Sequence, residues 1–143
     1  MLQQVNERVK VTNPENVADV LRAILKAESE VDQDKEHWWV MGMNTRNVIK
    51  YVDLVALGIL DSCLCHPRET FRLAVLKGVS SIIIAHNHPS ADPEPSEEDK
   101  KITVRMVEAG KIIGIEVLDH VIISNRSEIE GFTSLKARGL LNI

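Results

Sequence analysis

Apolar residues recur at helical spacing early in the chain, directly after a helix start signal. Asn13 is a good N-cap, and a proline and an acid occupy the next two positions, which is typical of a first helical turn. Apolar positions then follow at i, i+3, i+4, i+7 and i+8, which share one face of a helix. The pattern predicts an amphipathic scaffold helix whose buried face carries Val17, Val20, Leu21, Ile24 and Leu25.

Two apolar runs, 38–43 and 48–57, are separated by the polar stretch Asn44-Thr45-Arg46-Asn47, which predicts a hairpin. Gly58 interrupts the second run. A second helix is predicted from His66-Pro67 onward, because proline is favoured in the first helical turn. Its apolar residues are Phe71, Leu73, Ala74 and Leu76.

Residues 81–85, Ser-Ile-Ile-Ile-Ala, are apolar and mostly β-branched, which predicts a central strand covered on both faces. A loop with prolines at 89, 93 and 95 follows, and Ser96 begins a third helix predicted to end near Ala109-Gly110. Residues 121–123 predict a further strand, and residues 134–136 predict a short closing helix.

The composition is that of a globular protein, with 44% hydrophobic and 27% charged residues among 143. We expect one domain over residues 1–143, with its core at about 13–141. The net charge of −4 argues against a dominant nucleic-acid surface, because such surfaces neutralise phosphates with Lys and Arg. No stretch resembles a secretory signal or a membrane span, so a cytoplasmic location without membrane contact is expected.

Two pairs of reactive or polar residues are predicted to be structural. Cys63 and Cys65 are too few for a disulfide framework, and at i and i+2 they cannot bridge each other without strain. Plain thiols are therefore favoured over a metal or redox role. Asp119-His120 interrupts an apolar stretch, and hydrogen-bonded partners are favoured over a second metal site, because buried polar groups need partners.

The chemistry of the chain is concentrated just after the predicted central strand. His86 and His88 stand at i and i+2 there, and extended backbone directs such residues to the same side, where they can share one metal ion. Asp99 falls in the first turn of the helix that starts at Ser96 and faces back toward the strand end. Two imidazoles and one carboxylate leave the fourth position of a tetrahedral zinc site for water, whose pKa zinc lowers to about 7.

A plainer alternative makes the histidines exposed loop residues and Asp99 the partner of Ser96 in a capping box. A bare His-x-His motif favours this alternative, since short motifs often match by chance. The surroundings favour a metal site, because an apolar strand presents the histidines and three prolines stiffen the loop that leads to Asp99.

The whole string from His86 to Asp99 resembles the metal-binding signature of RadC-like proteins, members of the JAMM (MPN+) metalloprotease-like group. The resemblance implies a mixed α/β (α+β) fold of the cytidine-deaminase-like JAMM/MPN type, in which helices flank a curved mixed sheet. It also implies one Zn²⁺ per chain, held by His86, His88 and Asp99. It covers most of the chain, through Glu36-His37, Gly58, His66-Pro67-Arg68-Glu69, Leu118-Asp119-His120, Ser134-Leu135-Lys136 and Gly139-Leu140-Leu141.

The sequence departs from the family pattern at two points. Ala91 stands where the family usually has glycine, which tightens the loop and removes no ligand. Longer RadC-like proteins carry an N-terminal helix-hairpin-helix region that suggests DNA contact, whereas the sequence before Asn13 is too short to hold one. We therefore expect no such domain, and the family's association with DNA repair carries little weight.

A JAMM-type hydrolase needs a carboxylate that takes a proton from water and passes it to the leaving amine. The resemblance assigns this role to Glu36, just before the first strand of the hairpin; without the resemblance, Glu36 is a solvated charge. Glu69 is the competitor, although its place in a first helical turn is explained by the helix dipole. Ser96 can cap its helix and also direct its hydroxyl toward a developing oxyanion. The predicted catalytic residues are Glu36 and Ser96.

The leading hypothesis is a zinc-dependent hydrolase of a peptide or isopeptide bond, with a peptide or protein conjugate as substrate. One alternative is a non-catalytic module that binds a partner protein, which has no need of intact metal ligands and a glutamate. The other is a protein associated with DNA repair or mobile elements, which the acidic net charge disfavours.

Overall fold

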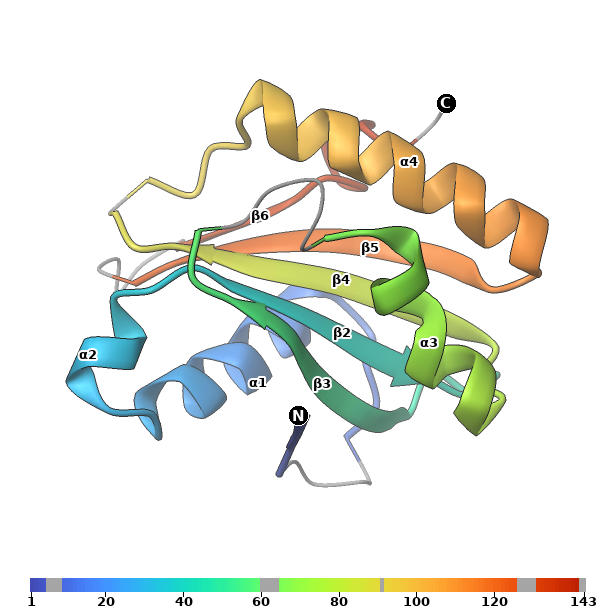
Figure 1. Ribbon diagram of the computed structural model, residues 1–143, viewed down its shortest axis with the longest axis horizontal. Coiled ribbons are helices and arrows are strands. Elements are labelled where there is room, and N and C mark those ends of the chain that lie inside the picture. The colour runs from blue at the N-terminus through green and yellow to red at the C-terminus, as the bar shows by residue number, and fades with distance from the viewer. Residues whose placement is uncertain (5–8, 60–64, 91, 126–130, 142–143) are drawn as a thin grey trace.

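The chain folds into one mixed β-sheet with helices on both of its faces (Figure 1). The computed structural model describes residues 1–4, 9–59, 65–90, 92–125 and 131–141. The strands among these residues are β1 (Leu2–Gln3), β2 (His37–Met43), β3 (Ile49–Leu57), β4 (Ser81–His88), β5 (Glu116–Ser124) and β6 (Phe132–Ser134). The helices are α1 (Pro14–Lys26), α2 (Glu30–Gln33), α3 (Pro67–Lys77) and α4 (Glu97–Ile113).

The six strands lie in the order β1-β3-β2-β4-β5-β6. The predicted hairpin is confirmed, because β2 and β3 pair antiparallel across a turn in which Asn47 adopts a positive φ of 59°. The predicted central strand is also confirmed, since β4 pairs antiparallel with β2 and parallel with β5, and its residues before His88 are all buried. This arrangement places the end of β4 in the interior of the sheet, between two other strands.

Each face of the sheet has its own hydrophobic cluster. One cluster packs α3 and α4 against the sheet and includes Phe71, Ile102, Met106, Trp38, Ile82 and Ile84. The other packs α1 against the opposite face and includes Leu21, Leu25, Met41, Ile83, Val121 and Ile123. Odd and even residues of β4 therefore serve different faces, as strand geometry requires. The chain is a single mixed α/β domain, as the resemblance implied.

The helix starts were predicted correctly. Asn13 caps α1 and forms a capping box with Asn16, and His66 caps α3 by accepting a hydrogen bond from the backbone N–H of Arg68. Ser96 caps α4 and forms a capping box with Asp99. These starts were predictable because each is encoded within about four consecutive residues.

Two predicted helix boundaries were wrong. Ser134 does not open a closing helix: it ends β6, and residues 135–139 form turns that end at Gly139, whose φ is 72°. The third helix does not end near Gly110 but continues to Ile113, and Gly114 provides the left-handed cap. Gly110 is buried inside the helix, where a Cβ atom would lie 2.5 Å from the carbonyl oxygen of Ile115. It is a close-packing glycine, and sequence alone does not distinguish that role from a cap.

Three short elements were not predicted, namely β1, α2 and β6, and β5 extends beyond the predicted 121–123. Cys65 is buried and forms no disulfide, in line with a core thiol, while Cys63 lies outside the described residues. Within the described part of the chain, no helix has the length and apolar character needed to cross a membrane.

Gly110→Ala tests the close packing of α4 on β5. Alanine normally favours a helix interior by about 1 kcal/mol over glycine. Here the added methyl group meets the backbone carbonyl of Ile115, so we expect a net loss of about 1–3 kcal/mol in the free energy of unfolding. Urea unfolding measures it, with the exposed Glu108→Ala as a control expected to stay within about 0.5 kcal/mol. A Gly110→Ala protein more stable than the unmodified chain would contradict this packing.

Candidate metal centre

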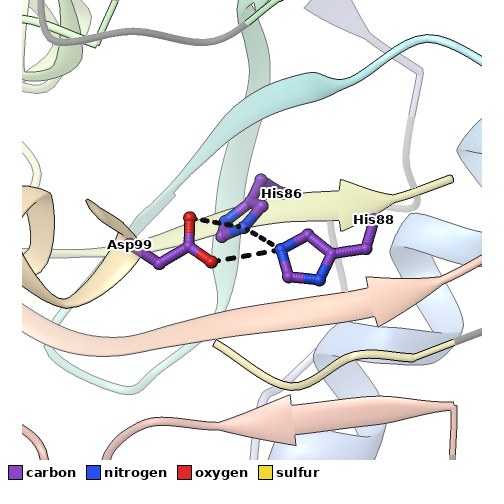
Figure 2. Close-up of side chains that lie close together, drawn as sticks. All are labelled: His86, His88 and Asp99. Atoms are coloured by element: carbon purple, nitrogen blue, oxygen red, sulfur yellow. Dashed lines mark hydrogen bonds and ion pairs between the residues drawn. The ribbon is translucent and has the colours of Figure 1, made fainter. Parts of the chain in front are cut away.

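Two histidines at the end of β4 and one aspartate in the first turn of α4 point toward one another (Figure 2). His86 Nε2 lies 3.0 Å from His88 Nε2. The two carboxylate oxygens of Asp99 lie 3.3 Å from His86 Nε2 and 3.1 Å from His88 Nε2. One ligand atom from each residue lies within 4.8 Å of the others. The three residues predicted to bind metal are thus brought together, and they form a candidate metal site.

The capping box of α4 sets the direction of the Asp99 carboxylate. The hydroxyl of Ser96 accepts a hydrogen bond from the backbone N–H of Asp99 at 3.1 Å, and Asp99 Oδ2 accepts one from the N–H of Ser96 at 2.8 Å. The oxygen that closes the box is also the one nearest His88. The capping box and the metal site were alternatives for Asp99 in the sequence, and the structure combines the two contacts.

A chain of buried hydrogen bonds determines which nitrogen of His86 faces the site. Thr103 donates its hydroxyl proton to the backbone carbonyl of Asp99 at 2.7 Å, so it can only accept from His120 Nδ1, 2.5 Å away. Burial lowers the pKa of His120 well below its ordinary value, which keeps this ring neutral with a lone pair on Nε2. His86 Nδ1 therefore donates to His120 Nε2 at 2.7 Å, and its own Nε2 keeps the lone pair.

His88 is oriented in the same sense. Its Nδ1 faces the backbone carbonyl of Asp92 at 3.1 Å and must donate to it, so the neutral form of the ring carries its lone pair on Nε2. Two imidazole lone pairs and a carboxylate then converge, and such a set of acceptors is stable only around a cation, either a proton or a metal ion. Neutral imidazole and carboxylate are common protein ligands of zinc. The residues present therefore fit a zinc ion, with His86, His88 and Asp99 as its holders.

The pKa shifts of Asp99 and His88 agree with a site that carries negative charge and favours a cation. Burial acts to raise the pKa of Asp99, but hydrogen bonds with His86 and His88 outweigh it and hold the pKa well below its usual value. The hydrogen bond with Asp99 raises the pKa of His88, against the effect of burial. Asp99 is thus ionised at neutral pH and favours the charged form of His88.

Trp38 on β2 forms a wall of the site that the sequence did not indicate. Its ring stacks on His86 with centroids 5.8 Å apart and meets His120 edge-on at 5.3 Å. Its indole N–H donates to the hydroxyl of Thr70 at 3.2 Å. Finding it required the pairing of β2 with β4, which places Trp38 opposite His86. Thr103 was also missed, although its position four residues after Asp99 puts both on one helix face.

The polar pair Asp119-His120 has the structural partners that were predicted. Asp119 accepts hydrogen bonds from the Ser134 hydroxyl at 2.6 Å and from the backbone N–H of Lys136 at 3.1 Å. The ring nitrogens of His86 and His88 that face away from the site also have hydrogen-bond partners. The partners are His120 Nε2 for His86 and a backbone carbonyl for His88, because β5 and the proline loop supply these acceptors.

The two candidate glutamates lie in different surroundings. Glu36 is half-buried and directly precedes β2, so alternation along the strand puts it on the same side as Trp38 and the ligand face of β4. Its charge contributes to the raised pKa of His88. Glu69, in the first turn of α3, pairs with Arg68 at 3.2 Å and Arg72 at 3.3 Å. The helix start and these arginines account for Glu69 without catalysis.

Comparison with known proteins shows which family the chain belongs to. The family model described as the RadC-like JAB domain matches residues 11–140, which is most of the chain. The chain belongs to the RadC-like JAB domain family. The candidate metal residues of this RadC-like domain lie within the matched region, and its mixed α/β fold is consistent with the family.

The RadC-like domain is similar to several bacterial proteins known as UPF0758 proteins. It is 44% identical to one from Caldanaerobacter subterraneus subsp. tengcongensis, over 97% of this chain and 56% of the relative. It is 42% identical to one from Desulforamulus reducens, over 94% of this chain and 55% of the relative. A third, from Clostridium beijerinckii, is 43% identical over 98% of this chain and 57% of the relative. The chain therefore spans about half the length of these curated relatives.

His120→Phe tests the control of the His86 tautomer. Phenylalanine can occupy the space of the imidazole beside Trp38, but it leaves His86 Nδ1 without an acceptor. Partners of metal-ligating histidines typically contribute 10–100-fold to metal affinity, and we expect a loss of about that size in zinc affinity. Competition with a chromophoric chelator measures it. Unchanged zinc affinity in a folded His120→Phe protein would show that His120 does not orient the ligand.

Proposed function

We propose that this RadC-like domain is a zinc-dependent hydrolase of the JAMM type that cleaves a peptide or isopeptide bond. The observation that carries the proposal is the convergence of His86, His88 and Asp99 on one point, with Glu36 on the same side of the sheet. The substrate class, a peptide or protein conjugate, and the cytoplasmic location are parts of the same proposal.

Each residue has a defined task in this reaction. His86, His88 and Asp99 hold the metal, which when bound polarises a carbonyl and lowers the pKa of water to about 7. Glu36 takes a proton from the water whose oxygen adds to the carbonyl carbon. When the C–N bond breaks, Glu36 returns that proton to the leaving nitrogen, which gives a carboxylic acid and an amine. Ser96 is exposed beside Asp99, and its hydroxyl can donate a hydrogen bond to the carbonyl oxygen as negative charge develops there.

The sequence alternatives lack a comparable supporting observation. A partner-binding module has no need of two imidazoles whose tautomers are set by separate hydrogen bonds. A DNA-directed role has little support in the composition, because the net charge is −4. Both alternatives are outcomes of the experiment that follows.

The test is a panel of extended peptides, lysine-linked isopeptide conjugates, and single- and double-stranded DNA. We expect the zinc-loaded protein to hydrolyse amide substrates and to leave DNA intact. Glu36→Gln removes the proton carrier while the three metal-binding residues stay, so turnover of the zinc-saturated protein should fall by about 10²–10⁴-fold. His88→Ala should lose zinc and activity together.

Glu69→Gln is the matched control, since it removes a carboxylate of the same size from α3. It should change stability slightly through its arginine pairs and leave turnover intact. DNA cleavage that requires His88, with every amide substrate untouched, would overturn the proposal. Full turnover by Glu36→Gln together with an inactive, folded and zinc-loaded Glu69→Gln would transfer the proton-carrying role to Glu69.

A further inference from the structure

Asn87 separates the two metal-binding histidines in the sequence, yet its side chain lies on the other side of the sheet. Strand alternation directs His86 and His88 toward α4 and directs Asn87 toward the face that α1 covers. Asn87 is fully buried. A fully buried amide needs partners for its oxygen and its nitrogen, and the structure supplies them.

The Asn87 side chain binds the peptide groups on both sides of Glu36. Its Oδ1 accepts a hydrogen bond from the backbone N–H of His37 at 2.6 Å, and its Nδ2 donates to the carbonyl of Lys35 at 3.0 Å. The orientation of the amide is fixed by these partners, because an N–H can only donate and a carbonyl can only accept. One side chain therefore holds the residues immediately before and after Glu36.

Further contacts hold the same segment. The carbonyl of Glu36 itself accepts a hydrogen bond from the N–H of Gly58 at 2.9 Å. Asn87 Nδ2 also donates to Asn125 Oδ1 at 3.0 Å, and Asn125 Nδ2 donates to the carbonyl of Gln33. The backbone that leads into β2 is thus held at residues 33, 35, 36 and 37 by groups from three different parts of the chain.

The buried ring of His37 completes the attachment. His37 Nδ1 lies 2.8 Å from the carbonyl of Lys35 and 3.1 Å from Asn87 Oδ1, and its Nε2 lies 2.5 Å from a carboxylate oxygen of Glu28. The ring stacks on Trp39 with centroids 4.8 Å apart. The residue after Glu36 is therefore fixed by its backbone and by both nitrogens of its side chain.

We propose that Asn87 is a positioning residue that fixes Glu36 relative to the metal-binding histidines. Asn87 is bonded covalently to His86 and His88 and by hydrogen bonds to the neighbours of Glu36, so it connects the ligands and the proton carrier through one residue. Catalytic groups must be held to within about 0.5 Å, and loops do this less well than strands. Asn87 gives the segment before β2 the rigidity of β4. This inference rests on the proposed role of Glu36.

The test is a double-mutant cycle in zinc affinity, measured by chelator competition on the full chain without any substrate. Glu36 is half-buried on the ligand side of the sheet, where its negative charge favours a bound cation, so Glu36→Gln alone should weaken zinc binding by about tenfold. In the Asn87→Ala background Glu36 is no longer held, and the same substitution should weaken binding by at most about threefold. We call the fold-loss of zinc affinity caused by Glu36→Gln the Glu36 factor. An equal Glu36 factor in both backgrounds would overturn the proposal, and so would a Glu36→Gln substitution without effect in the unmodified chain.

Asn87→Ser is the second variant, in case the alanine variant does not fold. A serine hydroxyl can bind one of the two peptide groups beside Glu36 but cannot span both, so it should also reduce the Glu36 factor. Ser134→Ala is the matched control, because it removes a buried hydrogen bond, to Asp119, away from Glu36. It should lower stability and keep the factor near tenfold. If Ser134→Ala reduces the factor as much as Asn87→Ala does, the effect is general loosening and the proposal is wrong.

The cycle separates this inference from the proposed function. A protein that cleaves no amide would contradict the proposed hydrolase, while the Glu36 factor in zinc affinity would still report whether Asn87 holds Glu36. Conversely, an active hydrolase with identical Glu36 factors in both backgrounds would retain the function and exclude the positioning role of Asn87.

Discussion

The candidate site brings three hydrogen-bond acceptors, two imidazole nitrogens and one carboxylate, into close contact, and in the absence of a cation these groups repel one another. His86 Nε2 and His88 Nε2 face each other at 3.0 Å, with the Asp99 carboxylate 3.3 Å and 3.1 Å away. When both imidazoles are neutral, each Nε2 directs a lone pair at the other and at the carboxylate, because hydrogen bonds elsewhere use the Nδ1 protons. A cation between these atoms, either a proton or a metal ion, makes the arrangement favourable, and this is why the three residues form a candidate metal site.

Several separate structural elements hold His86, His88 and Asp99 in this arrangement. β4 lies between β2 and β5, so the histidines project from a strand that is hydrogen-bonded on both sides. The helix start that aims Asp99 is closed by its own capping box. Beneath the ligands, the chain from Asp99 through Thr103 and His120 to His86 forms a continuous path of hydrogen bonds. On the far side of the sheet, Asn87 attaches the segment that carries Glu36 to the same strand.

Much of this could be predicted because it is encoded locally. Two local features predicted that three residues lie close together: His86 and His88 are two positions apart on extended backbone, and Asp99 follows the helix cap Ser96. Trp38, the acceptor role of His120 and the attachment by Asn87 were not predictable, since each depends on strand pairing between distant segments. The two wrong helix boundaries have a related cause: the residue types at 110 and 134 suit both a helix end and a tertiary contact, and only the packed structure distinguishes them.

Zinc content joined to X-ray absorption tests the central claim most directly. Protein prepared without chelators should contain about one zinc per chain, in a four-coordinate site of nitrogen and oxygen ligands without sulfur. His88→Ala, which removes one of the converging lone pairs, should abolish that signal while the rest of the fold is retained. No bound transition metal, coordination through sulfur, or an unchanged spectrum in His88→Ala would contradict a metal centre at His86, His88 and Asp99.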